Sequence, residues 1–145
     1  MSYAVAAEPH DTPGLKEAID GAIIQYNDRA HGPHGWTPLA LVIRDEAGVV
    51  AGGLWAESFF DWMLVRLLVI PEPARRTGLG TRLMRQAEQA AREAGLVGVW
   101  LDTFSFQARP FYEKLGYTCF ATLADHPRGG ARHFMAKRFD REGVA

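Results

Sequence analysis

A short segment with two arginines and two glycines, RRTGLG (residues 75–80), separates a nine-residue apolar stretch from a long amphipathic pattern. The apolar stretch, WMLVRLLVI (62–70), is apolar on both faces and stops at Pro71, which predicts a central strand of a sheet. Beyond the segment, apolar residues recur every three or four positions as far as Gly95, which predicts a helix with glycine just past its end. This succession of strand, glycine loop and helix constrains the fold more than any other feature.

The rest of the chain alternates between strand and helix patterns, which is typical of a mixed α/β domain. The segment 11–30 predicts a helix, and either Thr12 or Asp11 is expected to cap its start. The other expected elements are a strand at 2–8, a hairpin of strands at 39–45 and 49–59, a strand at 97–103, a short helix at 107–116 and a closing pair of strands at 117–123 and 131–139. The sequence shows no repeat and no linker long enough to divide it, so we expect one domain over residues 1–145.

Composition and charge exclude several classes of protein. The chain has 145 residues and a net charge of -1, so it is not a general binder of nucleic acids, and any basic site must be local. Cys119 is the only cysteine, which excludes an intramolecular disulfide and suits a reducing compartment. The start of the chain does not resemble a signal peptide, and the apolar stretch at 62–70 is too short to span a bilayer. We therefore expect a cytoplasmic protein with no nucleic-acid or membrane partner.

The arginine–glycine segment has the features of an anion site. Free N–H groups at the start of a helix attract anions, glycine lets the backbone approach a ligand, and Arg75 and Arg76 add positive charge. A diphosphate fits these features, although a solvated turn with surface arginines would contain the same residues. A Walker loop is excluded because Gly80 is not followed by lysine. A dinucleotide fingerprint is disfavoured because Leu83 stands where its third glycine or alanine belongs.

Residues 69–80, VIPEPARRTGLG, resemble the strand, loop and Arg-x-x-Gly-x-Gly signature of the GNAT acetyltransferases, which use acetyl-coenzyme A (acetyl-CoA). A second segment, QARPFYEKLGY at 107–117, resembles the other landmark of that family, in which tyrosine follows alanine by four residues and a glycine–aromatic pair comes next. The two segments stand in the family's order, and the resemblance covers roughly residues 38–138. It implies a single-domain α/β fold in which a mixed, mostly antiparallel sheet, flanked by helices, splays apart at its central strands.

The resemblance also implies where acetyl-CoA binds. Its pyrophosphate would lie on the backbone of the loop and of the first helical turn, which comprise Arg75, Arg76, Thr77, Gly78, Leu79, Gly80 and Thr81. Its pantetheine arm would pair with the strand edge at Leu68, Val69 and Ile70, so we expect the sheet to splay after Ile70. The family often has asparagine three positions before its alanine; here that position is Ser105, which can still hydrogen-bond the pantetheine or a water.

In that family the acetyl group passes directly to an amine while both substrates are bound. Tyr112 occupies the position that gives a proton to the leaving thiolate, and a packing role in the core wall is its other interpretation. A strand N–H near Leu68 would stabilise the oxyanion. Glu57 is the predicted base, with Asp61 and Asp102 as alternatives.

Several residues bear on the acceptor. Arg66 would favour an acceptor with a carboxylate if it faces the acceptor groove. His31, His34 and Trp36 stand where the family often forms a substrate lid, and no acid is suitably spaced for a metal site, so we expect no metal. We therefore predict an N-acetyltransferase that acts on a primary amine of a small molecule or peptide, with acetyl-CoA as co-substrate. A non-catalytic acyl-CoA-binding module is the alternative, and the oligomeric state stays open, with a homodimer the form that the family often takes.

Overall fold

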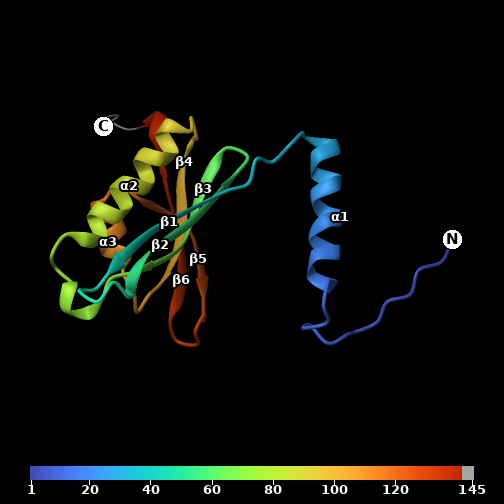
Figure 1. The fold of residues 1–145 in the computed structure, drawn as a ribbon, viewed down its shortest axis with the longest axis horizontal. Coiled ribbons are helices and arrows are strands. Elements are labelled where there is room, and N and C mark those ends of the chain that lie inside the picture. Colours follow the sequence, from blue (N-terminus) through green and yellow to red (C-terminus); the bar gives the residue numbers. More distant parts are fainter. Residues whose placement is uncertain (142–145) are drawn as a thin grey trace. The chain divides into compact units, whose positions relative to one another are not determined.

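A computed structural model describes residues 1–141 of the chain. The chain divides into two compact units, residues 1–34 and residues 35–145. The first unit contains helix α1 (Leu15–Ala30), and the second contains the sheet and the other helices (Figure 1). One domain over the whole chain stays a prediction.

The structure confirms the helix predicted in the first unit, but not its predicted caps or the strand predicted before it. Gly14 occupies the cap position of α1, so the predicted caps are wrong. The Thr12 hydroxyl donates instead to the carbonyl of Pro9 at 2.7 Å, which closes a turn ahead of the helix. The strand predicted at 2–8 is also wrong, because this segment has no partner strand within its own unit and a lone strand cannot form a backbone ladder.

The second unit is built on a six-stranded sheet with the strand order β1-β2-β3-β4-β6-β5. Neighbouring strands are antiparallel except for β3 and β4, which are parallel. The strands are β1 (Thr37–Arg44), β2 (Val50–Phe59), β3 (Trp62–Val69), β4 (Gly98–Phe104), β5 (Thr118–Ala124) and β6 (Ala131–Arg138). The mixed, mostly antiparallel sheet implied by the resemblance is therefore confirmed, and the apolar stretch forms a central strand.

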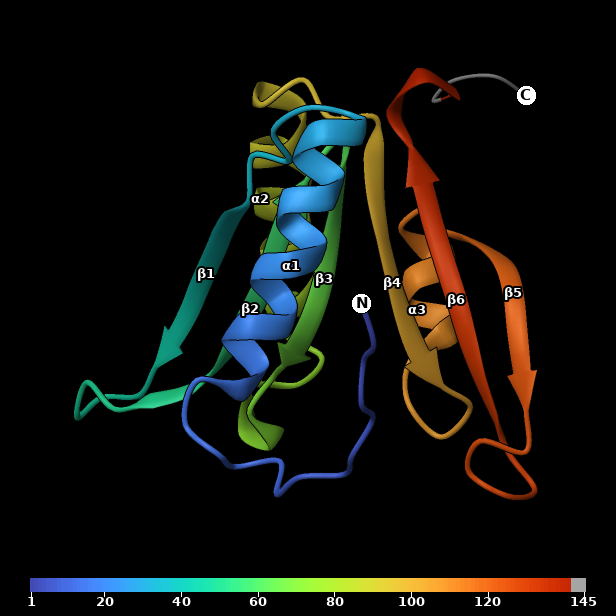
Figure 2. The same cartoon turned by 90° about the vertical axis from the view of Figure 1, so that its right-hand side faces the viewer.

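Helices α2 (Leu79–Glu93) and α3 (Arg109–Lys114) lie on the same face of the sheet (Figures 1 and 2). Pro110 stands in the first turn of α3, where its missing N–H removes no helical hydrogen bond. Two short 3-10 turns, Glu72–Ala74 and Phe139–Arg141, complete the elements of this unit. None of the helices within residues 1–141 is both long and apolar enough to cross a membrane.

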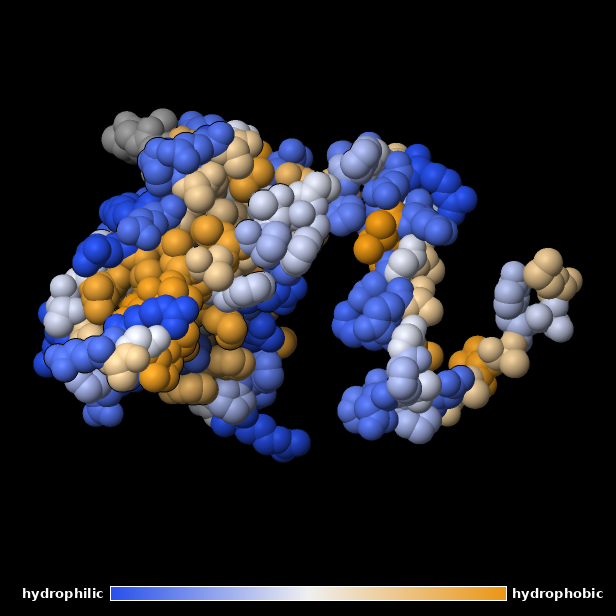
Figure 3. Space-filling model, viewed as in Figure 1, coloured by the Kyte–Doolittle hydropathy of each residue, from blue (hydrophilic) through white to orange (hydrophobic). Residues whose placement is uncertain are grey.

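The core of the second unit lies between α2 and the sheet. Its buried apolar side chains are Leu54, Ala56, Met63, Val65, Leu83, Met84, Ala87, Ala91, Val99, Leu101, Tyr112, Leu115, Tyr117 and Met135. Figure 3 shows apolar residues gathered on one face of this unit, with hydrophilic residues around them. The apolar stripe of α2 that the sequence predicted is thus the stripe that packs on the sheet.

The sheet splays between β3 and β4, as Figure 2 shows. These strands pair only over Trp62–Val65 and Gly98–Leu101, so the opening begins earlier than the predicted position after Ile70. The cause is a bulge: neighbouring residues Trp55 and Ala56 of β2 face Leu67 and Val65, which leaves Arg66 as an extra residue in β3. The edge of β3 beyond Val65 therefore has no strand beside it within the described residues.

A buried ion pair fastens α2 to β6. Glu88 is 2% exposed, and both of its carboxylate oxygens lie 3.1 Å from Nζ of Lys137, itself 8% exposed. The hydroxyl of Tyr117 lies 3.5 Å from the same carboxylate, which adds a weaker contact. Burial raises the pKa of Tyr117, and the negative charge of Glu88 raises it further. The pair therefore compensates two charges that would be costly alone in the core.

Replacing Glu88 with glutamine should lower the free energy of unfolding by about 3 kcal/mol, because the buried ammonium of Lys137 would lose this carboxylate. Urea denaturation followed by circular dichroism measures the change. The double variant Glu88→Leu/Lys137→Met should lose less than Glu88→Gln alone, because it removes both charges. A loss below about 1 kcal/mol for Glu88→Gln would show that the pair contributes no more than a surface ion pair.

Candidate active site

A groove of about 1100 Å³ runs along the open edge of β3. One wall is β3, another is the loop and first turn of α2, and a third is the end of β4 with α3. It is lined by most of the predicted cofactor residues and by the predicted acid: Leu68, Val69, Ile70, Arg75, Arg76, Gly78, Leu79, Gly80, Thr81 and Tyr112. Two segments that lie far apart in the sequence are thus brought to one site.

Three predicted site residues do not line this groove: Thr77, Ser105 and Glu57. The hydroxyl of Thr77 donates to the carbonyl of Ala74 at 2.5 Å, so its side chain closes the turn before α2. The backbone of Thr77 nevertheless remains part of the predicted loop.

The loop before α2 presents bare backbone to the groove. Arg76 (φ +65°) and Gly78 (φ +84°) both adopt the left-handed conformation, which is rare for arginine and clusters at functional turns. A Cβ added to Gly78 would meet nothing within 4 Å, so a ligand can approach the backbone there. A Cβ added to Gly80 would lie 3.2 Å from Cζ of Phe111, so this glycine lets α2 and α3 pack closely. The helix start, with arginines beside it, suits an anionic group.

Tyr112 lies in α3, and only 7% of its surface is exposed. Its ring packs edge-on against Phe111 and Tyr117, with centroid distances of 5.1 Å and 6.0 Å. Burial, with a smaller contribution from the negative charge of Asp102, raises the pKa of Tyr112 to about 12. The phenol is therefore protonated at neutral pH, although a pKa this high makes it a weaker acid than an ordinary tyrosine. Its role as proton donor stays a prediction.

Ser105 faces β6. Its hydroxyl accepts a hydrogen bond from the N–H of Ala131 at 3.1 Å, and its own N–H donates to the carbonyl of Ala131 at 2.8 Å. Gln107 lines the groove instead, and its Oε1 accepts a hydrogen bond from the N–H of Phe104 at 2.8 Å. An amide side chain thus stands beside the groove two positions after the expected one. A cofactor role for Ser105 stays a prediction.

Glu57 forms a fixed cluster with Arg66 and Trp36. Its carboxylate accepts hydrogen bonds from Nε of Arg66 at 2.6 Å and from Nε1 of Trp36 at 3.2 Å. Hydrogen bonding from Arg66, opposed in part by burial, lowers the pKa of Glu57. A carboxylate whose pKa is lowered in this way is a weaker proton acceptor. The negative charge of Glu57 also neutralises much of the positive charge of Arg66. The role of Glu57 as base stays a prediction.

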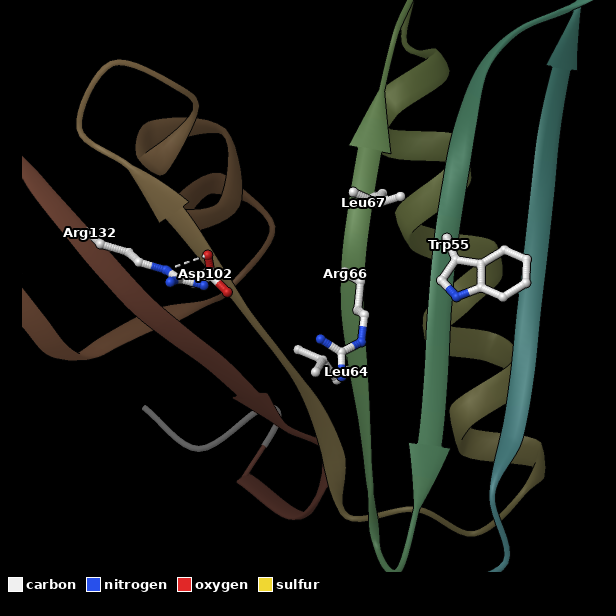
Figure 4. Close-up of a pocket in the computed structure, with 6 residues that line it drawn as sticks. All are labelled: Trp55, Leu64, Arg66, Leu67, Asp102 and Arg132. Atoms are coloured by element: carbon white, nitrogen blue, oxygen red, sulfur yellow. Dashed lines mark hydrogen bonds and ion pairs between the residues drawn. The ribbon is translucent and has the colours of Figure 1, made fainter. Parts of the chain in front are cut away.

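A second pocket of about 440 Å³ adjoins the groove at the splay. It is lined by Trp55, Leu64, Arg66, Leu67, Asp102 and Arg132 (Figure 4). Asp102 alternates with the buried residues Leu101 and Thr103, so its side chain points to the sheet face opposite α2. Arg66, Leu67 and Asp102 line both pockets, so the two cavities meet between β3 and β4.

The other polar candidates lie elsewhere. Asp61 precedes β3, at the opposite end of that strand from the groove. His34 lies 3.6 Å from Asp28, an arrangement internal to the first unit. Among residues 1–141, no group of three or more histidine, cysteine or acidic side chains could hold a metal ion.

Sequence reasoning missed several residues of the groove. These are Thr103, Phe104, Phe106, Gln107, Phe111 and Lys114, which come from β4, from α3 and from the loop between them. The motif QARPFYEKLGY pointed to this region, but its pattern selects only Ala108, Tyr112, Gly116 and Tyr117. The groove residues around them follow from how α3 packs against β4.

The groove, with the start of α2 and two arginines at one end and the open edge of β3 beside it, suits an extended co-substrate that carries a diphosphate. The model of the acetyltransferase (GNAT) family matches residues 5–117 of this chain. An acetyltransferase of Agrobacterium fabrum is 32% identical over 124 residues, which cover 86% of this chain and 90% of that protein. Blasticidin-S acetyltransferase of Streptomyces morookaense is 41% identical over 93 residues, which cover 63% of this chain and 68% of that protein.

The fold comparison agrees with the sequence comparison. The crystal structure of an acetyltransferase from Bacillus cereus has a TM-score of 0.80 to this chain at 32% identity, and the match covers 92% of this chain and 98% of that one. The chain belongs to the acetyltransferase (GNAT) family. It is an acetyl-CoA-dependent acetyltransferase, so the predicted family, fold and co-substrate are confirmed.

Proposed function

We propose that this enzyme transfers the acetyl group of acetyl-CoA to a primary amine of a small molecule while both substrates are bound. The observation that carries this proposal is the meeting of the long groove and the smaller charged pocket at the splay. The name of the related blasticidin-S acetyltransferase supports a small-molecule acceptor. A peptide amine remains the alternative acceptor.

The groove residues fit the parts of acetyl-CoA by their chemistry. The N–H groups at the start of α2, together with Arg75 and Arg76, would hold the diphosphate. The open edge of β3 at Leu68 and Val69, together with Ile70 just beyond it, would pair with the pantetheine as a further strand does. The acetyl group would then lie near the splay, where the second pocket admits the amine.

The reaction at the splay needs a hydrogen-bond donor to the oxyanion and a proton donor to the leaving sulfur. An N–H of the open β3 edge would stabilise charge on the thioester oxygen. The protonated phenol of Tyr112 would give its proton to the leaving sulfur. Binding both substrates at one junction also lowers the activation barrier, because the amine then attacks the thioester within one complex.

A panel of primary amines tests the proposal. Blasticidin S, ethanolamine, 1,4-diaminobutane and an alanine-terminated peptide would each be incubated with acetyl-CoA, and free thiol would be followed with a chromogenic reagent. Thiol release that depends on one of the small amines supports the proposal. Release with the peptide alone would assign a peptide acceptor. Tight acetyl-CoA binding without thiol release for any of these amines would contradict the proposed class of acceptor.

Acetyl-CoA should raise the melting temperature of the protein, whereas NAD and ATP should not. The long loop between β3 and α2 and the absence of a third glycine do not fit a dinucleotide or a Walker site. Thermal denaturation with each compound at equal concentration measures the effect. A shift with NAD alone would revive a dinucleotide site and would assign Asp102 to a ribose.

Two further predictions accompany this function. A homodimer is the oligomeric state that we propose, and sedimentation velocity tests it. The cytoplasm is the proposed location, and cell fractionation tests that.

A further inference from the structure

We propose that Asp102 binds the acceptor amine at the junction of the two pockets and takes its proton as the amine attacks. This inference rests on the proposed function, because it names the residue of the same site that receives the acceptor. It differs from the sequence-based prediction, in which Glu57 is the base.

Asp102 lies at the point where the sheet opens. β3 and β4 pair last at Val65 and Leu101, so Arg66 and Asp102 are the first residues on either side of the opening. Figure 4 shows Arg66 on β3 and Asp102 on β4, one on each of the two diverging strands. Asp102 lines the cofactor groove as well as the second pocket, so a group held by its carboxylate lies beside both.

Asp102 also carries the negative charge that an acceptor amine needs. Among the residues that the structure describes, Asp102 is the only carboxylate that lines either pocket. Glu57, which lines neither, is engaged by Arg66 and Trp36. An amine that arrives as an ammonium ion needs a negative partner at the junction, and Asp102 is placed to provide it.

Arg132 positions this carboxylate. Its Nε donates to Oδ1 of Asp102 at 2.8 Å, and its guanidinium lies over the rings of Phe104 and Phe134, 5.5 Å and 5.3 Å from their centroids. The pair is only partly buried, with side-chain exposures of 33% and 25%. One carboxylate oxygen of Asp102 is held in this bond, so the other is available to the amine.

The proton and electron balance of the step is complete with these residues. The bound ammonium first releases one proton to solvent, which leaves a neutral amine with a lone pair. Asp102 accepts the next proton from this amine as the new C–N bond forms. The C–S bond breaks, its electron pair stays on sulfur, and Tyr112 donates a proton to that sulfur. The two residues then regain their starting states by exchanging a proton with solvent. The burial of Tyr112 and its electrostatic coupling to Asp102 fit two proton-transfer groups at one junction.

The test compares Asp102→Asn, Asp102→Glu and Glu57→Gln on the small amine of the panel above that the wild-type enzyme acetylates fastest. Asp102→Asn should lower kcat/KM at least 100-fold, with an increase in KM for the amine and a decrease in kcat. Its acetyl-CoA Kd, measured by calorimetry, should stay within threefold of wild type. Asp102→Glu should recover part of the loss because it restores the charge, and Glu57→Gln should lose less than tenfold.

Glu46→Gln is the matched control, since it removes a carboxylate from an exposed turn outside both pockets, and its activity should be unchanged. A larger loss for Glu57→Gln than for Asp102→Asn would overturn the assignment and favour Glu57 as base. Wild-type activity in Asp102→Asn, or a loss confined to acetyl-CoA affinity, would overturn it as well. If the wild-type enzyme acetylated no small amine, the proposed function itself would be contradicted. The assignment of Asp102, which rests on that function, would then be contradicted as well.

Discussion

Replacing Tyr112 with phenylalanine should lower kcat by about 10- to 1,000-fold while acetyl-CoA affinity stays close to wild type. The ring and its contacts with Phe111 and Tyr117 remain, so the fold and the groove wall are kept. What is lost is the proposed proton donor, whose pKa of about 12 keeps it protonated at neutral pH. A thiolate is a good leaving group and needs less help from an acid than an amine does. For this reason the expected range of the loss in kcat begins as low as about tenfold. Steady-state kinetics with an acetylated amine, together with calorimetric titration of acetyl-CoA, measures both quantities.

Tyr117→Phe is the control for the loss of a buried hydroxyl. Tyr117 packs in the same core and contacts Glu88, but it does not line the groove. Its kcat should therefore stay near wild type. An unchanged kcat in Tyr112→Phe would return Tyr112 to a packing role, and a collapse of acetyl-CoA affinity would make its hydroxyl a binding group.

Replacing Gly78 with glutamate should weaken acetyl-CoA binding at least tenfold, which corresponds to about 1.4 kcal/mol. The space above Gly78 is open, so the new side chain would occupy the approach of the ligand to the helix start. Its negative charge would also repel a diphosphate. Calorimetric titration measures the change. Arg75→Ala should weaken binding less, and the loss should be larger at low salt, where charge interactions are less screened.

Gly95→Glu is a close control for this substitution. Gly95 follows the other end of α2, has a left-handed backbone (φ +73°) and also has nothing within 4 Å of an added Cβ. The variant therefore carries similar backbone strain and the same added charge, away from the groove, and it should bind acetyl-CoA normally. Equal losses in both variants would attribute the effect to strain. Gly80→Glu is less informative, because its Cβ would press on Phe111.

Local patterns predicted most of the elements of the fold. The alternation and length of apolar runs placed β1 to β6 within a few residues, and the period of α2 placed its buried stripe. These patterns succeed because each strand or helix must bury one face against the same core. The segment at 2–8 failed for the opposite reason: its composition suits a strand, but a strand also requires a neighbour.

The site was predictable only in part. The loop at 75–80 and Tyr112 belong to motifs whose residues are close in sequence, so the sequence alone located both and linked them to acetyl-CoA. Gln107 escaped prediction because the family pattern directs attention to Ser105, and only the turn after β4 determines which of the two side chains enters the groove.

The sequence by itself determined the family, the order of the elements from α1 to β6, the position of the glycine loop before α2 and the tyrosine that lines the groove. Only the tertiary structure decided where the sheet opens and which carboxylate stands at the opening. The extra residue at Arg66 shifts the register of β3 against β2 and ends its pairing with β4 at Val65. A shift of one residue exchanges the two faces of a strand, so the sequence could name Glu57 as base, with Asp61 and Asp102 as alternatives, but could not show which of them lines the opening.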